Sequence, residues 1–148
     1  MIETFDERVI SEFRARGGVV NGLQDLTLLL LHHVGAKSGS ERVTPLAFWL
    51  FSDNAAVVLA SNRGAPRHPD WYFNLVAHPT TTVEIGAETW SVRARVAAPG
   101  ERRKMTDRLV AESPSVASAV GRTSRQIPVV ILELLAKVDH PPRGDSRR

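Results

Sequence analysis

The sequence predicts a β-rich α+β domain in which about six antiparallel strands are flanked by short helices. Strand-length runs of apolar or alternating residues follow one another closely, with turn-forming residues such as Asp53-Asn54 and Gly86 between them. Close spacing favours antiparallel hairpins, because parallel strands need a long crossover connection. Helical periodicity is confined to four short stretches. Six strands with alternating faces can close into a small barrel.

The first element is a short amphipathic helix over residues 3–16, which Gly17-Gly18 ends. Its apolar stripe consists of Phe5, Val9, Ile10 and Phe13. We expect this stripe to pack on the barrel or on a partner subunit. The alternative is a helix that rests on a membrane surface. It is disfavoured because the polar face mixes acidic and basic residues instead of being rich in lysine and arginine.

Strand-like runs come next, over residues 26–34, 43–51 and 55–60. Pro45 lies inside the second run. Because proline cannot donate a hydrogen bond to a β-ladder, we expect an edge position or a bulge there. A short helix over 69–77 follows, and Pro79 stops its continuation.

The second half of the chain begins with the clearest strand signal. Residues 80–85 and 89–96 alternate between apolar and polar side chains with a period of two, which is typical of a sheet with one buried face. Helices over 99–111 and 114–121 and a final strand over 129–135 complete the predicted order.

Length and composition agree with one globular domain. Of 148 residues, 43% are hydrophobic and 24% are charged. We expect the domain to span residues 1–139, with a disordered tail rich in Pro, Gly and Arg over 140–148. Cysteine is absent from the sequence, which excludes disulfides, iron–sulfur clusters and thiolate catalysis. Neither a signal-peptide pattern nor a membrane-length apolar run is present, so we expect a cytoplasmic protein.

The formal net charge is +3. Acidic residues are interspersed among the basic ones, so the polybasic stripe of a nucleic-acid-binding protein is missing. A modest positive excess suits a small anionic ligand better. One basic run, in residues 102–108, is typical of a solvated helix face, although it could also meet an acidic ligand tail.

Residues 35–42 connect the first two strands and read Gly-Ala-Lys-Ser-Gly-Ser-Glu-Arg. Two glycines let the backbone fold tightly and direct its amides at one point. Lys37 and Arg42 add positive charge, and Ser38 adds a hydroxyl donor. This pattern is compatible with a cradle for a phosphate diester, but it is no Walker A loop. A solvated hairpin turn remains the alternative.

A second segment, residues 60–77, leaves a strand through Ser61-Asn62-Arg63-Gly64 and enters a helix that carries Trp71 and Asn74. Polar and cationic side chains therefore stand beside a large aromatic residue, which suits a loop that grips a planar anionic cofactor. Trp71 and Asn74 lie three residues apart and share one helix face. The alternative is an ordinary connection, with Trp71 in the core and Asn74 tethering the helix to nearby backbone.

Histidines do not form a metal site in this sequence. His32 and His33 are neighbours on a strand and therefore point to opposite faces. His68 and His78 have no carboxylate or histidine at ligand spacing. No Gly-x-Ser-x-Gly elbow indicates a hydrolase.

Together, residues 34–45 (Val-Gly-Ala-Lys-Ser-Gly-Ser-Glu-Arg-Val-Thr-Pro) and residues 60–77 resemble the deazaflavin-dependent nitroreductase and quinone reductase family, which uses coenzyme F-420 as hydride donor. The family pattern pairs Thr-Gly-Arg-Lys-Ser-Gly-x-x-Arg-x-x-Pro with Ala-Ser-x-Gly-Gly-x-x-x-x-Pro-x-Trp-x-x-Asn-Leu. The resemblance covers residues 26–130. It implies a split β-barrel like that of the FMN-binding, pyridoxamine-phosphate-oxidase-like proteins.

The resemblance also implies a binding role for the first segment. Lys37 and Arg42 would bind the phosphate of the cofactor's acidic tail, with Ser38 and the backbone of Gly39 beside them. One contact is missing, because Ala36 stands where the family usually has arginine.

In the second segment, the resemblance implies a ring pocket. Pro45 and Ala60 would line it, Ser61 and Asn62 would hydrogen-bond the pyrimidine carbonyls, and Trp71 would form a wall. Asn74 would tie the loop or the tail. Arg63 replaces a glycine of the family and could either supply the missing cation or narrow the pocket. Ser61 is also the catalytic candidate, as a hydrogen-bond donor to the substrate while charge develops.

The implied function is a reductase that passes a hydride from reduced F-420 to a small electrophile, namely a quinone, an activated alkene or a nitroaromatic. A non-catalytic carrier of deazaflavin or of another hydrophobic ligand, and an FMN-binding protein, are the alternatives. Residues 113–121 lack the tyrosines of nitroimidazole-activating members, so we expect quinones to be reduced better. We expect no nucleic-acid partner and allow for a homodimer.

Overall fold

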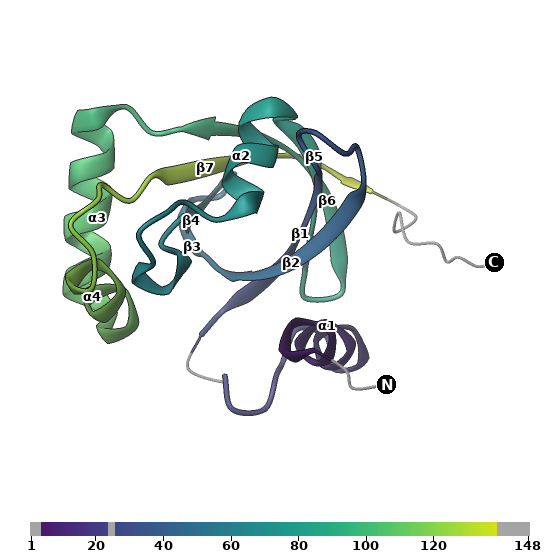
Figure 1. The fold of residues 1–148 in the computed structure, drawn as a ribbon. Helices are drawn as coiled ribbons and strands as arrows, with labels where there is room; N and C mark the ends of the chain where they lie inside the picture. Colours follow the sequence, from purple (N-terminus) through teal and green to yellow (C-terminus); the bar gives the residue numbers. More distant parts are fainter. Residues whose placement is uncertain (1–3, 24–25, 139–148) are drawn as a thin grey trace.

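One curled sheet of seven antiparallel strands forms the centre of the computed structural model, which describes residues 4–23 and 26–138 (Figure 1). The strands are β1 Leu28–Val34, β2 Glu41–Ala47, β3 Trp49–Ser52, β4 Ala55–Leu59, β5 Thr80–Ile85, β6 Glu88–Val96 and β7 Val129–Val138. Their order across the sheet is β2-β1-β5-β6-β7-β4-β3. The tail expected to be disordered lies outside the described residues.

In the described residues, four α-helices agree closely with the predicted ones, and a short 3-10 turn that was not predicted is added. They are α1 Phe5–Ala15, the 3-10 turn η1 Asn62–Gly64, α2 Asp70–Ala77, α3 Pro99–Glu112 and α4 Pro114–Gly121. Figure 1 shows α2 over one end of the curled sheet, α3 and α4 on one side, and α1 on the outside. None of the described helices is long and apolar enough to cross a membrane.

The strand predicted over residues 43–51 is two strands, which is why the sheet has seven strands and not six. Phe48 interrupts it: its side chain is buried and its N–H donates to the Thr27 carbonyl at 3.0 Å. The chain bends there, so β2 pairs with β1 while β3 pairs with β4. One short segment thus supplies both edges of the sheet. Pro45 lies on the edge strand β2, as its missing N–H predicts.

The core fills the inside of the curled sheet. Its fully buried members include Leu29, Leu31, Val58, Val83 and Leu132, which come from four different strands. Trp71 and Leu75 of α2 pack into the same cluster and close its upper end. A second cluster joins α3 and α4 to the outer face of the sheet; it contains Val57, Ala97, Leu109, Val116, Val129 and Ile131.

Most of the apolar stripe of α1 packs on the sheet, as predicted. Val9 and Phe13 are buried against Val20, Leu28 and Leu30, whereas Phe5 is 49% exposed. The membrane alternative receives no support, because Val9 and Phe13 are covered by the protein's own residues.

An ion-pair cluster fastens the end of α1 to the sheet. Arg14 donates from Nε and Nη2 to the two carboxylate oxygens of Glu84 at 3.0 and 2.7 Å. His32 Nε2 lies 2.6 Å from Glu84 Oε2. Burial alone would raise the pKa of Glu84, but the hydrogen bonds from His32 and Arg14 and the Arg14 charge lower it to about 2.

Candidate functional site

A tight hairpin loop joins β1 to β2 and carries most of the predicted anion ligands. The Gly35 N–H donates to the Ser40 carbonyl at 2.8 Å, and the Gly39 N–H donates to the Gly35 carbonyl at 2.9 Å. A Cβ on Gly35 would overlap the Ser38 hydroxyl, so any other residue there would displace the Ser38 side chain. Gly39 has a φ of 74°, which glycine also adopts most readily.

Beside this loop lies a pocket of about 460 Å³, a size within the usual range for small-molecule sites. Its lining comprises Gly35, Ala36, Lys37, Ser38, Arg42, Arg67, Asp70, Phe73 and Asn74. Three cationic side chains face one carboxylate, that of Asp70. The carboxylate lies 3.4 Å from Arg67 and 4.0 Å from Arg42 and is largely exposed. The pocket is therefore suited to an anion.

Asn74 fixes the loop from below. It is 5% exposed, and its Oδ1 accepts a hydrogen bond from the Ala36 N–H at 2.9 Å. Its Nδ2 lies 2.9 Å from His33 Nδ1, and His33 Nε2 lies 2.8 Å from the Thr44 hydroxyl. This contact is the tether from the helix to nearby backbone that the ordinary-connection alternative predicts, and a role of Asn74 in cofactor binding stays a prediction.

His33 is neutral at physiological pH. Burial, and then the nearby Arg42 charge, lower its pKa to about 4. A neutral ring can accept at Nδ1 from the Asn74 amide while it donates from Nε2 to Thr44. Its neighbour His32 points to the other face and binds Glu84, so the two histidines are separated as the alternation predicts.

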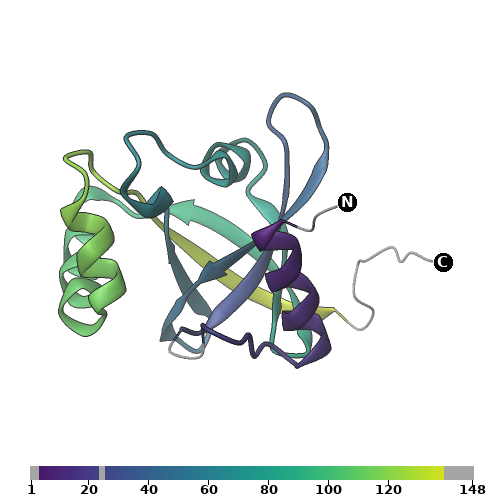
Figure 2. The same ribbon diagram turned by 60° about the horizontal axis from the view of Figure 1, so that its bottom comes forward.

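The second predicted segment leaves β4 at Leu59 and turns through η1. Asn62 and Arg63 have φ values of 48° and 55°, an uncommon conformation for residues other than glycine. A Cβ on Gly64 would lie 2.6 Å from the Arg122 Cβ, so glycine lets the turn approach the end of α4 closely. Figure 2 shows η1 and the β1–β2 loop at the same end of the barrel, with α2 between them.

Arg125 holds this turn in place. Its Nη2 donates to the carbonyls of Ala60 and Ser61 at 3.1 and 2.7 Å, and its Nε donates to the Ala65 carbonyl at 2.8 Å. Its Nη1 lies 2.7 Å from His68 Nδ1, which must accept because a guanidinium only donates. Burial and the Arg125 charge lower the pKa of His68. We term these contacts the Arg125 clamp.

The structure distributes the predicted site residues over two neighbouring places. Lys37, Ser38, Arg42 and Asn74 line the anion pocket, and Gly39 belongs to its loop. Ala60, Ser61, Asn62 and Arg63 lie along the turn that the Arg125 clamp holds. Pro45 is half-buried on β2, whereas Trp71 is 6% exposed and packs in the core.

One segment joins the two places. Asn62 Nδ2 donates to the Arg67 carbonyl at 3.0 Å, and the Arg67 side chain lines the anion pocket. Residues 60–70 therefore form a continuous track from η1 to the pocket.

Sequence reasoning missed Arg67, Asp70, Phe73 and Arg125. The first three stand beside predicted residues, and their approach to the loop depends on how α2 docks. Arg125 lies in an irregular stretch without a motif, and its partners are backbone carbonyls some 60 positions away. No signal in the sequence identifies such a contact.

The sequence of this chain matches a known protein family and several of its relatives. The model of the family described as F420H(2)-dependent quinone reductase matches residues 6–134. An F420H(2)-dependent quinone reductase of Mycobacterium tuberculosis (strain ATCC 25618 / H37Rv) is 36% identical over 107 residues, which are 70% of this chain and 71% of the relative.

Solved structures show the same likeness. The structure of an F420-H2 dependent reductase is 36% identical in sequence, with a TM-score of 0.62 over 72% of this chain and 93% of that chain. A domain-swapped dimer is 33% identical, with a TM-score of 0.64 over 84% of this chain and 94% of that chain.

A more distant likeness concerns the fold alone. A structure from Listeria innocua in the pyridoxamine 5'-phosphate oxidase group is 10% identical, with a TM-score of 0.54 over 78% of this chain and 90% of that chain. It confirms the predicted split barrel. The family match over most of the chain and the relatives above 30% identity show that the chain belongs to the F420H(2)-dependent quinone reductase family, whose members are oxidoreductases that use coenzyme F-420.

Proposed function

We propose that this protein reduces quinones with a hydride from reduced F-420, and that residues 35–42 and 60–70 hold the cofactor. The observation that carries this proposal is the pocket with three cations. Asn74 fixes the loop beside this pocket, and residues 60–70 connect the pocket to η1. A phosphate and an acidic tail match the cations, and a planar ring matches the turn.

The cationic side chains act on the anionic tail. Lys37, Arg42 and Arg67 donate charge-assisted hydrogen bonds to phosphate and carboxylate oxygens. The Ala36 N–H is already bound to Asn74, so this contact supports the loop without a ligand. Arg67 supplies a third cation in a site where the family's usual arginine is replaced by Ala36.

At the other end of the track, the bound deazaflavin supplies the hydride. The chain orients the ring and stabilises charge on the acceptor. The Ser61 hydroxyl is half-buried and forms no hydrogen bond within residues 4–23 and 26–138, so it is free to donate to an oxygen on which negative charge develops.

Substrate choice depends on the wall above η1. The α4 helix packs against η1, and it carries only small and aliphatic side chains besides its serines. Without a tyrosine there, nitroaromatics and activated alkenes receive neither a flat wall nor a hydroxyl donor from α4. We expect quinones to have a higher kcat/KM than bicyclic nitroimidazoles.

A spectral titration tests the cofactor. Oxidised F-420, FMN and FAD are compared side by side, followed by turnover of menadione with reduced F-420. F-420 should bind with a Kd in the range of about 1–10 μM, or roughly −8 kcal/mol. Equal or tighter binding of FMN would support a flavin protein instead, and binding of F-420 without turnover of any acceptor would support a carrier.

We also infer a homodimer, for which the solved domain-swapped relative is the support. Val76 and Val96 are 57% and 43% exposed and lie on a shallow apolar groove between α2 and β6. Light scattering coupled to size exclusion measures the mass in solution, and a monomer at all concentrations would contradict the inference.

A further inference from the structure

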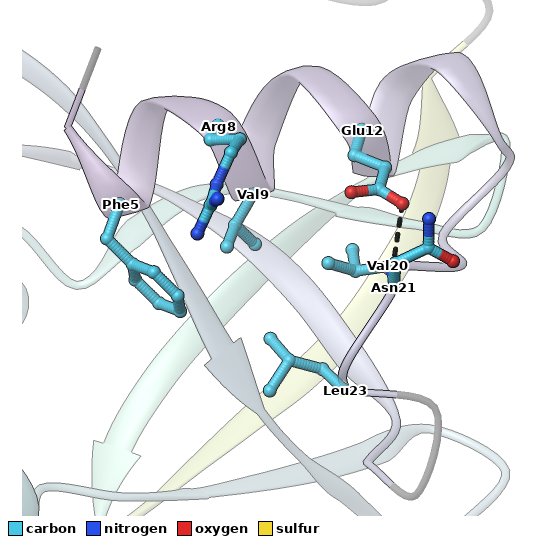
Figure 3. A pocket seen from close by; sticks show the side chains of 7 residues that line it. All are labelled: Phe5, Arg8, Val9, Glu12, Val20, Asn21 and Leu23. Atoms are coloured by element: carbon cyan, nitrogen blue, oxygen red, sulfur yellow. Dashed lines mark hydrogen bonds between the residues drawn. The ribbon is translucent and has the colours of Figure 1, made fainter. Parts of the chain in front are cut away.

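A second pocket of about 270 Å³ lies between α1 and the segment that returns beneath it (Figure 3). Its lining consists of Phe5, Arg8, Val9, Glu12, Val20, Asn21 and Leu23. Val9 and Val20 are almost fully buried and, with Leu23, give the pocket an apolar floor. It shares no residue with the anion pocket. Its volume lies just below the range of sites for drug-sized ligands, which suits a molecule of one or two rings.

Hydrogen bonds fix the far end of this pocket. Glu12 Oε2 accepts from the Asn21 N–H at 2.8 Å and from Arg16 Nη1 at 3.0 Å. Arg16 Nη1 also donates to Asn21 Oδ1 at 2.8 Å. These contacts hold the returning segment at a set distance from α1, so the cavity is maintained by the fold.

The near end of the pocket carries a cation. Within the described part of the chain Arg8 has no ion-pair contact within 4.0 Å, and its guanidinium lies 5.6 Å from the centre of the Phe5 ring. The backbone hydrogen bond from Asn21 is the main cause that lowers the pKa of Glu12, and the Arg8 charge helps to lower it. Figure 3 shows Phe5, Arg8 and Val9 projecting from α1 on the same side. An apolar floor with an aromatic ring and one strong donor at its mouth is suited to a planar ligand that bears an oxygen acceptor.

Phe5 also connects this pocket with the cofactor track. The guanidinium of Arg63, in η1, lies 5.8 Å from the centre of the same ring. Phe5 is 49% exposed although it is large and apolar, so part of its side chain is accessible to a ligand. Hydride transfer needs acceptor and donor within about 3–3.5 Å, so an acceptor in this pocket requires the bound deazaflavin ring to extend to the Phe5 side of η1.

We propose that this pocket is the acceptor site, in which a quinone ring lies against Phe5, Val9 and Leu23 with one oxygen toward Arg8. The proposal rests on the proposed function, and it supplies the aromatic wall and the donor that α4 lacks. The quinone gains a hydride, which brings two electrons and one proton, and takes a second proton from water to become a hydroquinone. Arg8 stays protonated and stabilises the oxygen on which negative charge develops.

Binding of menadione to the protein without cofactor tests the site directly. Titration calorimetry gives its Kd for the parent, Phe5→Leu and Arg8→Gln. Phe5→Leu retains apolar volume and removes the ring, and Arg8→Gln removes the charge. Each should raise the Kd of menadione, and its KM in turnover, by about fivefold or more. Arg103→Gln, on the exposed face of α3, is the matched control and should change neither.

The Kd of oxidised F-420 separates the two proposals. It should stay within about twofold of the parent in both pocket variants, since neither residue belongs to the anion pocket. If the parent does not bind F-420, the proposed function is wrong. The menadione titration then still tests whether this pocket binds a quinone. Menadione binding that is unchanged in both variants, or absent from the parent with and without F-420, would overturn the acceptor site.

Discussion

His33 on β1 and Asn74 on α2 are hydrogen-bonded inside the barrel at 2.9 Å, and Asn74 also accepts a hydrogen bond from the Ala36 N–H of the anion loop. The loop backbone is thus positioned by the barrel interior and not only by its own glycines. His33 in turn is fixed by Thr44 on the edge strand β2. A surface loop that is supported in this way can remain ordered without ligand.

Asn74→Ala should lower both stability and cofactor affinity. It leaves the Ala36 N–H and His33 Nδ1 without partners, and such a loss costs about 1–3 kcal/mol. Urea denaturation gives the free energy of unfolding, and a spectral titration gives the Kd of F-420. Ala77→Ser, at an exposed position of the same helix, is the control. A variant as stable as Ala77→Ser would mean that the contact with Asn74 does not support the loop.

Stability should fall as the pH drops from about 6.5 to about 4. The pKa of His33 is lowered in the folded state to about 4, so within this window the unfolded chain binds more protons. The loss reaches at most about 3 kcal/mol. Denaturation at a series of pH values measures it, and His33→Gln should flatten this part of the profile.

Glu84 should make the stability depend on pH in a second, more acidic range. Its pKa is about 2, so its contribution is complete above about 4.5 and is lost as the pH falls toward 2. Glu84→Gln should loosen α1 at neutral pH and cost about 2 kcal/mol, because it weakens a largely buried ion pair. Hydrogen exchange in α1 reports the loosening. Glu88→Gln, which breaks an exposed pair with Lys137, should leave α1 protected.

Arg125→Lys should weaken F-420 binding by about tenfold, because an ammonium cannot reach three carbonyls and a histidine at once. Residues 61–64 would then lose the contacts that hold their left-handed turn. Arg93→Lys, on an exposed position of β6, serves as the control. Equal Kd values for the two variants would show that the Arg125 clamp is not needed for the cofactor site.

Lys37→Ala and Arg42→Ala should each weaken F-420 binding by about tenfold or more, since each removes a charge-assisted hydrogen bond. Raising the ionic strength should weaken binding by the parent and have less effect on the two variants. Lys104→Ala, on α3, is the control. If the Kd of F-420 for Lys37→Ala and for Arg42→Ala equals that for Lys104→Ala, the acidic tail of the cofactor binds elsewhere.

Local patterns were sufficient to predict most of the fold. Alternation located β5 and β6, and proline and glycine located the helix ends. The break at Phe48 was not predictable, because an apolar residue inside an apolar run carries no turn signal. The tight loop between β1 and β2 was predictable because its glycines are visible in the sequence, and its role in anion binding stays a prediction. The Arg125 clamp and the contact between Phe5 and Arg63 join distant segments, so only the folded chain reveals them.

The place of β7 in the sheet has a consequence for biosynthesis. It lies between β6 and β4, although it is the last strand in the chain, and it alone joins the half of the sheet that contains β1 to the half that contains β3. A nascent chain can form the three local hairpins early, but their apolar faces stay open until residue 138 has left the ribosome. Folding is then completed after translation of the domain, through long-range pairing that is slow to form.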